Sequence, residues 1–372
     1  MRIVHINTSD RTGGAAQVAR CLRSEQARRK HQVSLISRET LGIPRHLNVL
    51  AYRLSSREGV FSSWSGFLRS GEFKNAEIVH LHNAHGYYMP LWALTEILKK
   101  PCLWTLHDYW LLTGRCAMPE ACTGFVTGCD PCPYKRKYPA TWLDRAAIDF
   151  RYRRKLLGSK VQFVSPSEST RIHFTNDCHS IRTICNPVQM PDQLPTRIDA
   201  RHRLGLPLDR TVVLFSARRL GEPRKGLQTF LKALDGTRDS DRLHPVFVGE
   251  KGSLRLPGPG LVGKAEMTDY LCASDIVVVP STMETFGLIY AEAVIAGASV
   301  IAADIPIARE VLGRTGRFHA PNDHETLAGL LREQPQYAGP ESRSQALEMF
   351  SVRRACDLYL EAYAQAIESQ LR

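Results

Sequence analysis

The sequence predicts an α/β protein built from two doubly wound parallel sheets, and three observations support this fold class. The chain has 372 residues, about twice the length of a typical domain. Its composition, with 43% hydrophobic and 23% charged residues, is that of an ordinary globular protein. Apolar runs of strand length alternate with helix-length segments, the βαβ pattern of a parallel sheet. We therefore expect two Rossmann-like domains, rather than one small module or a disordered chain.

The predicted strands fall into two groups, separated by a proline-rich stretch. They are residues 3–6, 33–36, 78–81, 103–106 and 161–164 in the first half, and 212–216, 246–248, 276–280 and 299–302 in the second. The stretch that begins at Pro187 has little apolar periodicity, which is typical of an interdomain linker. We expect a first domain over residues 1–186 and a second over 187–350.

The last segment, residues 351–372, is predicted to be a helix. Ser351 is a suitable N-cap, and apolar residues such as Tyr359 and Tyr363 recur behind it at helical spacing. A helix with one apolar face has to bury that face against another element. We therefore expect this helix to pack back on the first domain.

The charge balance indicates an anionic partner. The 49 basic residues outnumber the 37 acidic ones, for a net charge of +12, which would attract a phosphate-bearing ligand, an anionic membrane or a nucleic acid. No apolar run approaches the ~18 residues of a membrane span. Residues 1–7 lack the pattern of a secretion signal, so we expect a cytosolic protein with reduced thiols.

Two glycines, Gly13 and Gly14, follow the first predicted strand and precede a helical segment. Ligands of open parallel sheets bind beyond the carboxyl ends of the strands, where helix N-termini attract anions. Glycines let backbone amides approach a ligand closely, which predicts a phosphate contact here. A tight strand-to-helix turn without a ligand would use the same two residues.

Four cations follow the first strand of the second half: Arg218, Arg219, Arg224 and Lys225. A helix is expected to start directly after them, at Gly226. The cluster therefore lies where a diphosphate could be neutralised. A solvated loop is the alternative interpretation of such a charge run.

Residues 280–293 carry the most informative pattern, a strand end, a loop with Glu284, and a helix from Gly287. Glu284 could accept hydrogen bonds from sugar hydroxyls, and Glu292, two helical turns later, from a ribose diol. A helix start between two carboxylates predicts a nucleotide-sugar site, whereas either glutamate alone would be taken as a surface side chain. The amides expected to face a diphosphate are those of Phe286, Gly287 and Leu288.

Taken in order, these motifs resemble those of the family 4 retaining glycosyltransferases of GT-B fold. The resemblance covers nearly the whole chain, and its most specific part is the E-x-F-G-x-x-x-x-E stretch from Glu284 to Glu292. Residues 80–88 and 104–110 resemble the branch that builds bacterial exopolysaccharide of the colanic-acid type. The implied fold is two Rossmann-like domains facing each other across a cleft.

The resemblance implies a role for each motif. Glu284 would hold the donor sugar, Glu292 the ribose, and Lys225 with an arginine the diphosphate, while His107 would lie near the transferred sugar. The family's clamp usually has a tighter spacing, which leaves the identity of the arginine open. The three candidates are Arg218, Arg219 and Arg224.

The implied reaction is retaining transfer of a sugar from a nucleoside diphosphate donor, with UDP or GDP, to a saccharide that is lipid-linked in this branch. Cations and helix amides could stabilise the departing diphosphate, so we expect no catalytic metal. The D-x-D sequence Asp239-Ser240-Asp241 does not directly follow a predicted strand, and we interpret it as a polar loop.

Two other function classes share these features. A sugar-nucleotide epimerase of the same architecture would bind the same donor, and detection of transfer would separate the two enzymes. A basic, zinc-containing protein could bind nucleic acid. The basic residues of this chain lack a base-reading fold, so we expect no nucleic-acid partner.

Four cysteines lie in a Gly- and Pro-containing loop over residues 114–133. Cys129 and Cys132 form a C-x-x-C pair, and Cys116 and Cys122 precede them. Four thiols can hold a tetrahedral structural zinc, which would order an irregular loop. Four unrelated reduced thiols are the alternative, because the first two spacings match no familiar zinc finger.

Residues 135–160 carry much of the net charge, with nine basic residues against Asp144 and Asp149. Aromatic and apolar residues such as Trp142 lie between the cations. This pattern suits a helix on the anionic inner face of the cytoplasmic membrane, where it would present the site to a lipid-linked acceptor. An amphipathic helix that covers the first sheet has the same pattern.

Overall fold

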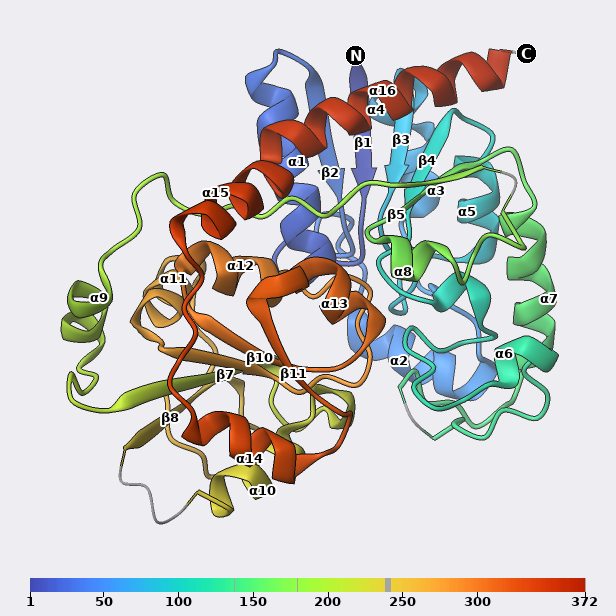
Figure 1. Ribbon diagram of the computed structural model, residues 1–372. Helices are drawn as coiled ribbons and strands as arrows, with labels where there is room; N and C mark the ends of the chain where they lie inside the picture. Colours follow the sequence, from blue (N-terminus) through green and yellow to red (C-terminus); the bar gives the residue numbers. More distant parts are fainter. Residues whose placement is uncertain (137, 179, 238–241, 372) are drawn as a thin grey trace. The chain divides into compact units, whose positions relative to one another are not determined.

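The computed structural model describes residues 1–136, 138–178, 180–237 and 242–371, and the chain divides into two compact units (Figure 1). Unit 1 comprises Met1–Pro187 and Val352–Arg372, and unit 2 comprises Val188–Ser351. Each unit has one parallel sheet, so the predicted α/β fold class is confirmed. Lys137 and the Asp239-Ser240-Asp241 motif lie outside the described residues.

The sheet of unit 1 has six parallel strands in the order β2-β1-β3-β4-β5-β6. The strands are β1 (Arg2–Ile6), β2 (Gln32–Ile36), β3 (Ile78–Leu81), β4 (Cys102–Thr105), β5 (Gln162–Ser165) and β6 (Ile181–Thr183). The five strands predicted for this half are present within one residue of their expected bounds. The sequence pattern missed β6, because this three-residue strand has no fully buried side chain.

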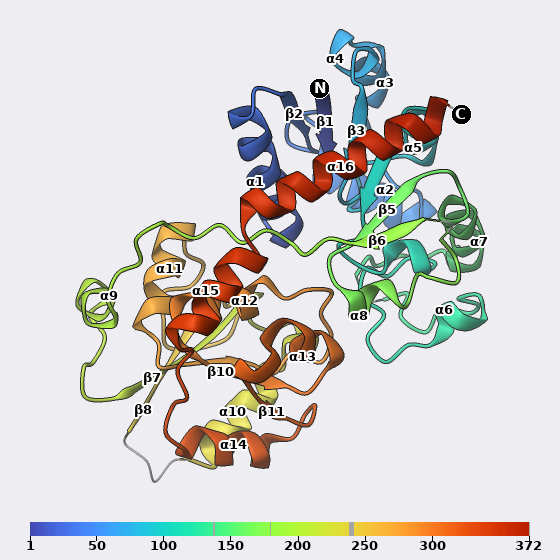
Figure 2. The ribbon, with the colours of Figure 1, turned by 45° about the horizontal axis from the view of Figure 1, so that its top comes forward.

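The helices of unit 1 include a long one from the C-terminal end of the chain. They are α1 (Gly14–Arg28), α2 (Arg45–Ser55), α3 (Trp64–Arg69), α4 (Gly71–Lys74), α5 (Leu91–Ile97), η1 (Trp110–Leu112), α6 (Gly124–Thr127), α7 (Ala146–Leu157), α8 (Glu168–Arg171) and α16 (Val352–Leu371). α16 packs across the sheet beside α1 (Figure 2). Tyr359 and Tyr363 of α16 share one apolar core with Ile3, Ile78 and Leu103 of the sheet.

The sheet of unit 2 has five parallel strands in the order β11-β10-β9-β7-β8. The strands are β7 (Thr211–Arg219), β8 (Leu243–Glu250), β9 (Ile276–Val279), β10 (Ser299–Ala303) and β11 (Gly316–His319). All four predicted strands are present. The pattern missed β11, whose Gly-Arg-Phe-His sequence contains no apolar run.

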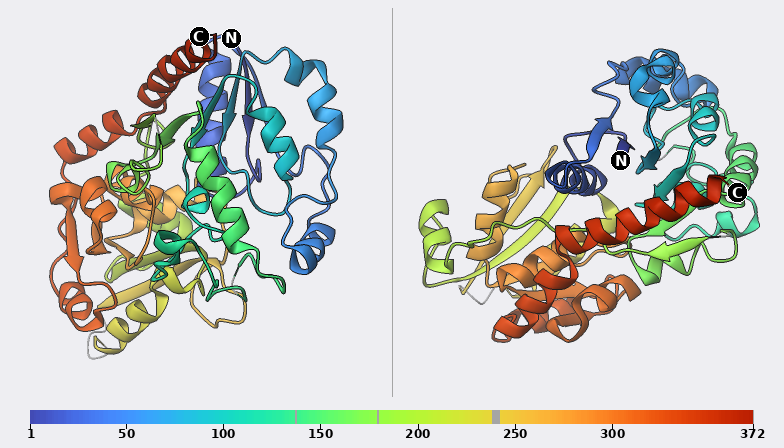
Figure 3. Two further views of the ribbon diagram at one scale, coloured as in Figure 1. Left: turned by 90° about the vertical axis from the view of Figure 1, so that its right-hand side faces the viewer. Right: turned by 90° about the horizontal axis from the view of Figure 1, so that it is seen from above.

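Helices of unit 2 connect these strands and cover the sheet. They are α9 (Arg197–Leu204), η2 (Pro223–Lys225), α10 (Leu227–Asp235), α11 (Lys264–Ala273), α12 (Leu288–Ala296), α13 (Pro306–Leu312), η3 (Gly313–Thr315), α14 (His324–Arg332) and α15 (Pro340–Met349). Phe215, Phe230 and Phe247 form the aromatic centre of the core. Both sheets and their covering helices can be followed in the further views of Figure 3.

In each unit, the parallel arrangement brings the carboxyl ends of the strands to one edge of the sheet. The loops after β1, β3 and β4 therefore meet at one edge in unit 1, and the loops after β7 and β9 meet at one edge in unit 2. These loops carry most of the predicted site residues. Of the helices in the described part of the chain, none has both the length and the hydropathy that crossing a bilayer requires.

Candidate active site

Glu284 follows β9 in unit 2 and is buried between two cations. The Lys225 ammonium lies 2.5 Å from its Oε1, and the Arg224 Nη1 lies 3.4 Å from its Oε2. Burial alone would raise the pKa of this carboxyl, but the two cations outweigh burial and hold the pKa of Glu284 below its usual value. Glu284 is therefore a carboxylate at neutral pH and can only accept hydrogen bonds.

Lys225 reaches this carboxylate because the chain passes very close to the end of β9. Gly226 has a φ of +73°, and a Cβ there would lie 2.2 Å from the carbonyl oxygen of Pro280. The Thr282 amide donates a hydrogen bond to the carbonyl oxygen of Arg224 at 2.8 Å. The loops after β7 and β9 are thus joined through their backbones, and only glycine fits at the crossing.

The other two arginines of the cluster have a different partner. Arg218 and Arg219 lie 3.7 and 3.6 Å from the carboxylate of Glu250, and all three side chains are about half exposed. Exposed ion pairs of this length contribute little stability, which leaves both guanidinium groups available to an anionic ligand. Arg224, in contrast, is mostly buried and also bonds Glu222 at 2.6 Å.

Glu292 lies in α12, and its carboxylate is buried on a helix whose other inward residues are apolar. Lys264, the first residue of α11, forms an ion pair with it. α12 begins at Leu288, directly after Gly287, which has a φ of +72°. The first amides of a helix have no partner within it and lie at the positive end of its dipole. The start of α12 can therefore attract an anion.

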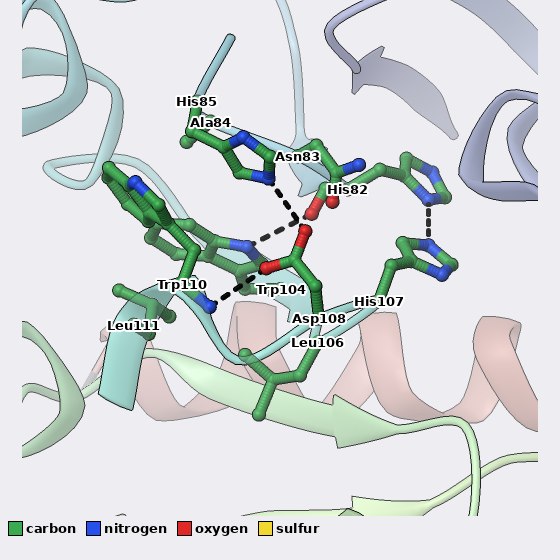
Figure 4. Close-up of a pocket in the computed structure, with 10 residues that line it drawn as sticks. All are labelled: His82, Asn83, Ala84, His85, Trp104, Leu106, His107, Asp108, Trp110 and Leu111. Carbon is green, nitrogen blue, oxygen red and sulfur yellow. Dashed lines mark hydrogen bonds and ion pairs between the residues drawn. The ribbon is translucent and has the colours of Figure 1, made fainter. Parts of the chain in front are cut away.

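A pocket in unit 1 lies beyond the ends of β3 and β4 (Figure 4). It is lined by His82, Asn83, Ala84, His85, Trp104, Leu106, His107, Asp108, Trp110 and Leu111. His85 Nε2 lies 2.6 Å from Asp108 Oδ2. Burial lowers the pKa of His85, but Asp108 outweighs burial and raises this pKa above its usual value. Burial likewise opposes the charge of Asp108, yet His85 holds the pKa of Asp108 below its usual value.

The sequence did not single out this ion pair, although both residues lie in the two segments that carry the family resemblance. His107 lies nearby and is neutral. Its Nε2 is 2.9 Å from His82 Nδ1, and burial lowers the pKa of His107 to about 4. His107 can therefore act through a hydrogen bond, and not through a positive charge at neutral pH.

Gly13 and Gly14 lie between β1 and α1, at the same edge of the sheet. Gly13 has a φ of +97°, which explains the choice of glycine there. The Ser9 hydroxyl oxygen accepts hydrogen bonds from the amides of Arg11 and Thr12. The loop before Gly13 is therefore stabilised by hydrogen bonds within the loop itself. This geometry agrees with both interpretations of the two glycines, a tight strand-to-helix turn and a contact with a phosphate.

The four cysteines of the 114–133 loop line one small pocket in unit 1. A hydrogen bond between Cys116 and Cys132 lowers the pKa of the Cys132 thiol and raises the pKa of the Cys116 thiol. All four thiols are free of disulfides. In the described part of the chain, no three of their sulfur atoms lie within 4.8 Å of one another. The loop gathers the thiols around one cavity without drawing them into a tetrahedron.

The basic segment over residues 135–160 contains α7, and its cations have different surroundings. Arg153 is buried, donates hydrogen bonds to the carbonyl oxygens of Trp110 and Thr113, and stacks 3.7 Å from the centre of the Trp110 ring. Arg154 forms an ion pair with Asp177. Arg153 is therefore part of the packing of unit 1, as expected if α7 covers the first sheet, and it is not available to a membrane. Among the described residues of the segment, the exposed cations are Lys135, Arg136, Arg151, Lys155 and Lys160.

Two family models match the chain. The model described as Glycosyltransferase Family 4 matches residues 12–190, and the model described as Glycosyl transferases group 1 matches residues 210–333. A curated protein of Escherichia coli (strain K12), named as the colanic acid biosynthesis glycosyl transferase WcaC, is 28% identical over 318 residues. That alignment covers 78% of this chain and 75% of the relative.

Solved structures resemble the chain over nearly its full length. A sucrose-phosphate synthase from Thermosynechococcus elongatus has a TM-score of 0.71 at 16% identity, with 99% of both chains covered. Alr3699/HepE of Anabaena, solved in complex with UDP-glucose, has a TM-score of 0.67 at 16% identity, with 98% of this chain and 99% of the other covered. At this identity, the likeness shows the fold.

The family matches follow one another along the chain and together span most of it, and the structural likeness extends over both units. Each unit has the parallel-sheet architecture that the resemblance predicted. The chain therefore belongs to the glycosyltransferases, with a family 4 domain in its first half and a group 1 domain in its second, and it has the GT-B fold.

Proposed function

We propose that this protein is a retaining hexosyltransferase that moves a sugar from a nucleoside diphosphate donor to a saccharide acceptor during cell-surface or exopolysaccharide biosynthesis. The observation that carries the proposal is the buried Glu284 carboxylate, ion-paired with Lys225 near the start of α12. The name of WcaC, a colanic acid biosynthesis protein, supports a role in exopolysaccharide biosynthesis. The UDP-glucose complex of HepE supports a nucleoside diphosphate sugar as the donor. Because both matching family models are glycosyltransferase models, an epimerase or a nucleic-acid-binding protein is the weaker alternative.

Unit 2 would bind the donor. Lys225 and Arg219 would face the diphosphate, together with the backbone amides of residues 286–288 at the start of α12. Glu284 would accept hydrogen bonds from the sugar hydroxyls, and Glu292 from the ribose. Without a donor, Lys225 neutralises Glu284. An incoming diphosphate would form an ion pair with the Lys225 ammonium group in place of Glu284. The Glu284 carboxylate could then accept hydrogen bonds from the sugar.

The reaction would need little else from the protein. The bond between the sugar C1 and the diphosphate oxygen breaks, and a bond forms between C1 and the acceptor hydroxyl oxygen on the same face. The hydroxyl proton passes to the departing diphosphate, whose charge is stabilised by the two cations and the helix amides. We therefore propose a mechanism without a catalytic metal. His107 of unit 1 would contact the transferred sugar through a hydrogen bond, and Gly13 and Gly14 would offer amides to a phosphate.

We also propose that unit 1 rests on an anionic membrane, where it would meet a lipid-linked acceptor on the cytoplasmic side. Leu47, Leu50 and Leu54 form an exposed apolar stripe on α2. The Trp142 amide donates to the carbonyl oxygen of Arg53 at 2.9 Å, which places the exposed Trp142 beside the end of that stripe. Apolar side chains close to the exposed cations of residues 135–160 are typical of a membrane-facing surface.

The cysteine loop is proposed to bind a structural zinc. The four thiols already line one pocket, which is the observation that supports this proposal. Binding would draw the sulfur atoms to the separation of about 3.8 Å that a tetrahedral Zn–S site imposes. The zinc would hold the loop and take no part in the transfer.

The first prediction tests the reaction. Glu284→Gln keeps the shape of the side chain but loses its charge. The rate of sugar transfer should therefore fall at least tenfold, as expected when one charge-assisted hydrogen bond to the sugar is lost. Transfer is measured with a panel of UDP- and GDP-sugars and acceptor lipids, and NMR of the product should show the donor's anomeric configuration. Glu333→Gln, which removes an ion pair with Arg317 elsewhere in unit 2, is the matched control. Near-normal transfer by folded Glu284→Gln protein, or inversion at C1, would refute the proposal.

The second prediction identifies the arginine that assists Lys225. Arg219→Ala and Lys225→Ala should each weaken nucleoside diphosphate binding by about tenfold or more, measured by titration calorimetry. The melting temperature of Arg219→Ala should equal that of the wild type, since Arg219 is exposed. Arg224→Ala should lower the melting temperature, because Glu222 and Glu284 lose a buried partner. Wild-type affinity of Arg219→Ala, with weak binding by a normally stable Arg224→Ala, would reverse the assignment.

The third prediction concerns the metal. Protein purified without added metal should contain about one zinc per chain by elemental analysis, and Cys129→Ser with Cys132→Ser should lose it. Cys21→Ser with Cys102→Ser, two buried thiols outside the loop, should keep it. Active wild-type protein without zinc would leave the four thiols as ordinary reduced cysteines.

The fourth prediction concerns the membrane. The protein should sediment with anionic vesicles at low ionic strength and be released as salt rises. Leu54→Ser should weaken this binding, whereas Leu261→Ser in unit 2 should not, although the two side chains are similarly exposed at 57% and 58%. Equal binding of both variants, or no preference for anionic over neutral vesicles, would show that the α2 stripe does not face lipid.

A further inference from the structure

The side chain of Tyr290 lies beside the candidate donor site of unit 2, and the proposed function does not use it. Tyr290 is the third residue of α12, and its backbone amide donates a hydrogen bond to the carbonyl oxygen of Gly287 at 2.9 Å. The side chain is completely buried. A tyrosine at this position therefore brings a polar hydroxyl group into the interior of unit 2.

The ring of Tyr290 points back along the helix, toward the loop that carries Glu284. Side chains of a helix are tilted toward its N-terminus. A Cβ placed on Gly287 would lie 2.5 Å from both Cδ2 and Cε2 of the ring, and 3.5 Å from Cζ, the carbon that carries the hydroxyl. The ring therefore passes over the backbone of Gly287, where only glycine leaves room for it.

The hydroxyl of Tyr290 lies near the charges of the candidate site. Burial and the carboxylate of Glu284 raise the pKa of Tyr290 well above its usual value, although Arg224 opposes them. The hydroxyl therefore keeps its proton and can donate a hydrogen bond. Of the two charged groups beside it, the guanidinium of Arg224 can only donate, so Glu284 is the one that could accept.

This hydroxyl nevertheless has no hydrogen-bond partner among the residues that the structure describes. A buried polar group without a partner is costly, and native proteins keep few of them. Lys225 and Arg224 hold the carboxylate of Glu284 at a place where it does not bond the hydroxyl. In the free protein, the two cations thus keep Tyr290 from its nearest charged acceptor.

A nucleoside diphosphate would remove one of these two cations from Glu284. The proposed function assigns the ammonium of Lys225 to the diphosphate, whereas Arg224 is held in place by a second ion pair, with Glu222. Once Lys225 pairs with the diphosphate, the buried carboxylate loses one of its donors. The hydroxyl of Tyr290 is the buried donor beside this carboxylate that still needs an acceptor.

We propose that Tyr290 is a positioning residue, whose hydroxyl donates a hydrogen bond to the Glu284 carboxylate once a nucleoside diphosphate has taken Lys225. The bond would hold the carboxylate in place while it accepts hydrogen bonds from the sugar. The inference rests on the proposed function in one respect, the binding of the diphosphate by Lys225. It implies that the hydroxyl favours nucleotide binding at the expense of the stability of the free protein.

A purely structural role would have a different signature. If a buried water molecule bonded the hydroxyl, the hydroxyl would have the same partner with and without nucleotide. Its removal would then destabilise the free protein and leave the nucleotide affinity unchanged. The two accounts therefore predict opposite effects on stability and on affinity.

Tyr290→Phe removes the hydroxyl and keeps the ring. The melting temperature of the free variant should equal or exceed that of the wild type, because no hydrogen bond is lost. Its affinity for UDP or GDP, measured by titration calorimetry with the nucleotide that the wild type prefers, should fall about tenfold, since the complex loses one hydrogen bond to a charged group. Tyr359→Phe is the control, because its buried hydroxyl bonds Thr105 at 3.0 Å. It should lower the melting temperature and keep the affinity.

A double-mutant cycle with Lys225→Ala separates the exchange of partners from a fixed contact. In Lys225→Ala protein, Glu284 lacks the ammonium even without nucleotide, so the Tyr290 hydroxyl should already bond the carboxylate. Adding Tyr290→Phe should then lower the melting temperature by several degrees, although the same substitution does not lower it in the wild type. This comparison requires no ligand and no activity.

The outcomes separate this inference from the proposed function. An equal change in melting temperature on adding Tyr290→Phe to the wild type and to Lys225→Ala protein would overturn the inference. Wild-type nucleotide affinity of Tyr290→Phe would overturn it as well. The expected melting temperatures and affinities in a protein that transfers no sugar would refute the proposed function and leave the exchange of partners in place. A wild type that binds neither UDP nor GDP would refute both.

Discussion

Parallel strands end at the same edge of their sheet, and the polar chemistry of both units depends on this constraint. In unit 2, β7 and β9 are neighbours although they are far apart in the sequence, so the loops that follow them meet. That meeting brings Lys225 to Glu284, 59 residues away, and Gly226 permits the close approach. In unit 1, the adjacent ends of β3 and β4 bring His82 to His107 in the same way.

The two edges differ in their electrostatics, and the difference suits two tasks. At the edge of unit 2, cations outweigh burial and keep Glu284 ionised, so this edge can exchange one charged partner for another. At the edge of unit 1, burial dominates and His107 stays neutral, while contact with Asp108 raises the pKa of His85 and contact with His85 lowers the pKa of Asp108. In the proposed function, the first edge would bind the diphosphate and the second would contact the transferred sugar.

The sequence predicted nine strands because each is largely apolar in the middle. It missed β6, which is short, and β11, which is largely polar. The motifs of unit 2 were recognisable because their residues lie close together in the chain. The hydrogen bonds that join Gln26, His5 and His82 were not, since they depend on α1 and α16 covering one face of the sheet. The sequence did not reveal the burial of Arg153 for a similar reason. Its partner Trp110 is 43 residues away, and a charge pattern does not reveal such a contact.

The proposed function requires a nucleoside diphosphate to bind at the carboxyl edge of unit 2. Hydrogen–deuterium exchange, measured on the full chain with and without saturating UDP or GDP, tests this requirement. Bound nucleotide should slow exchange in the peptides that cover residues 216–226 and 281–292, where amides and cations would hold the diphosphate. Protection that is confined to unit 1, with unchanged exchange in both of these segments, would contradict the claim.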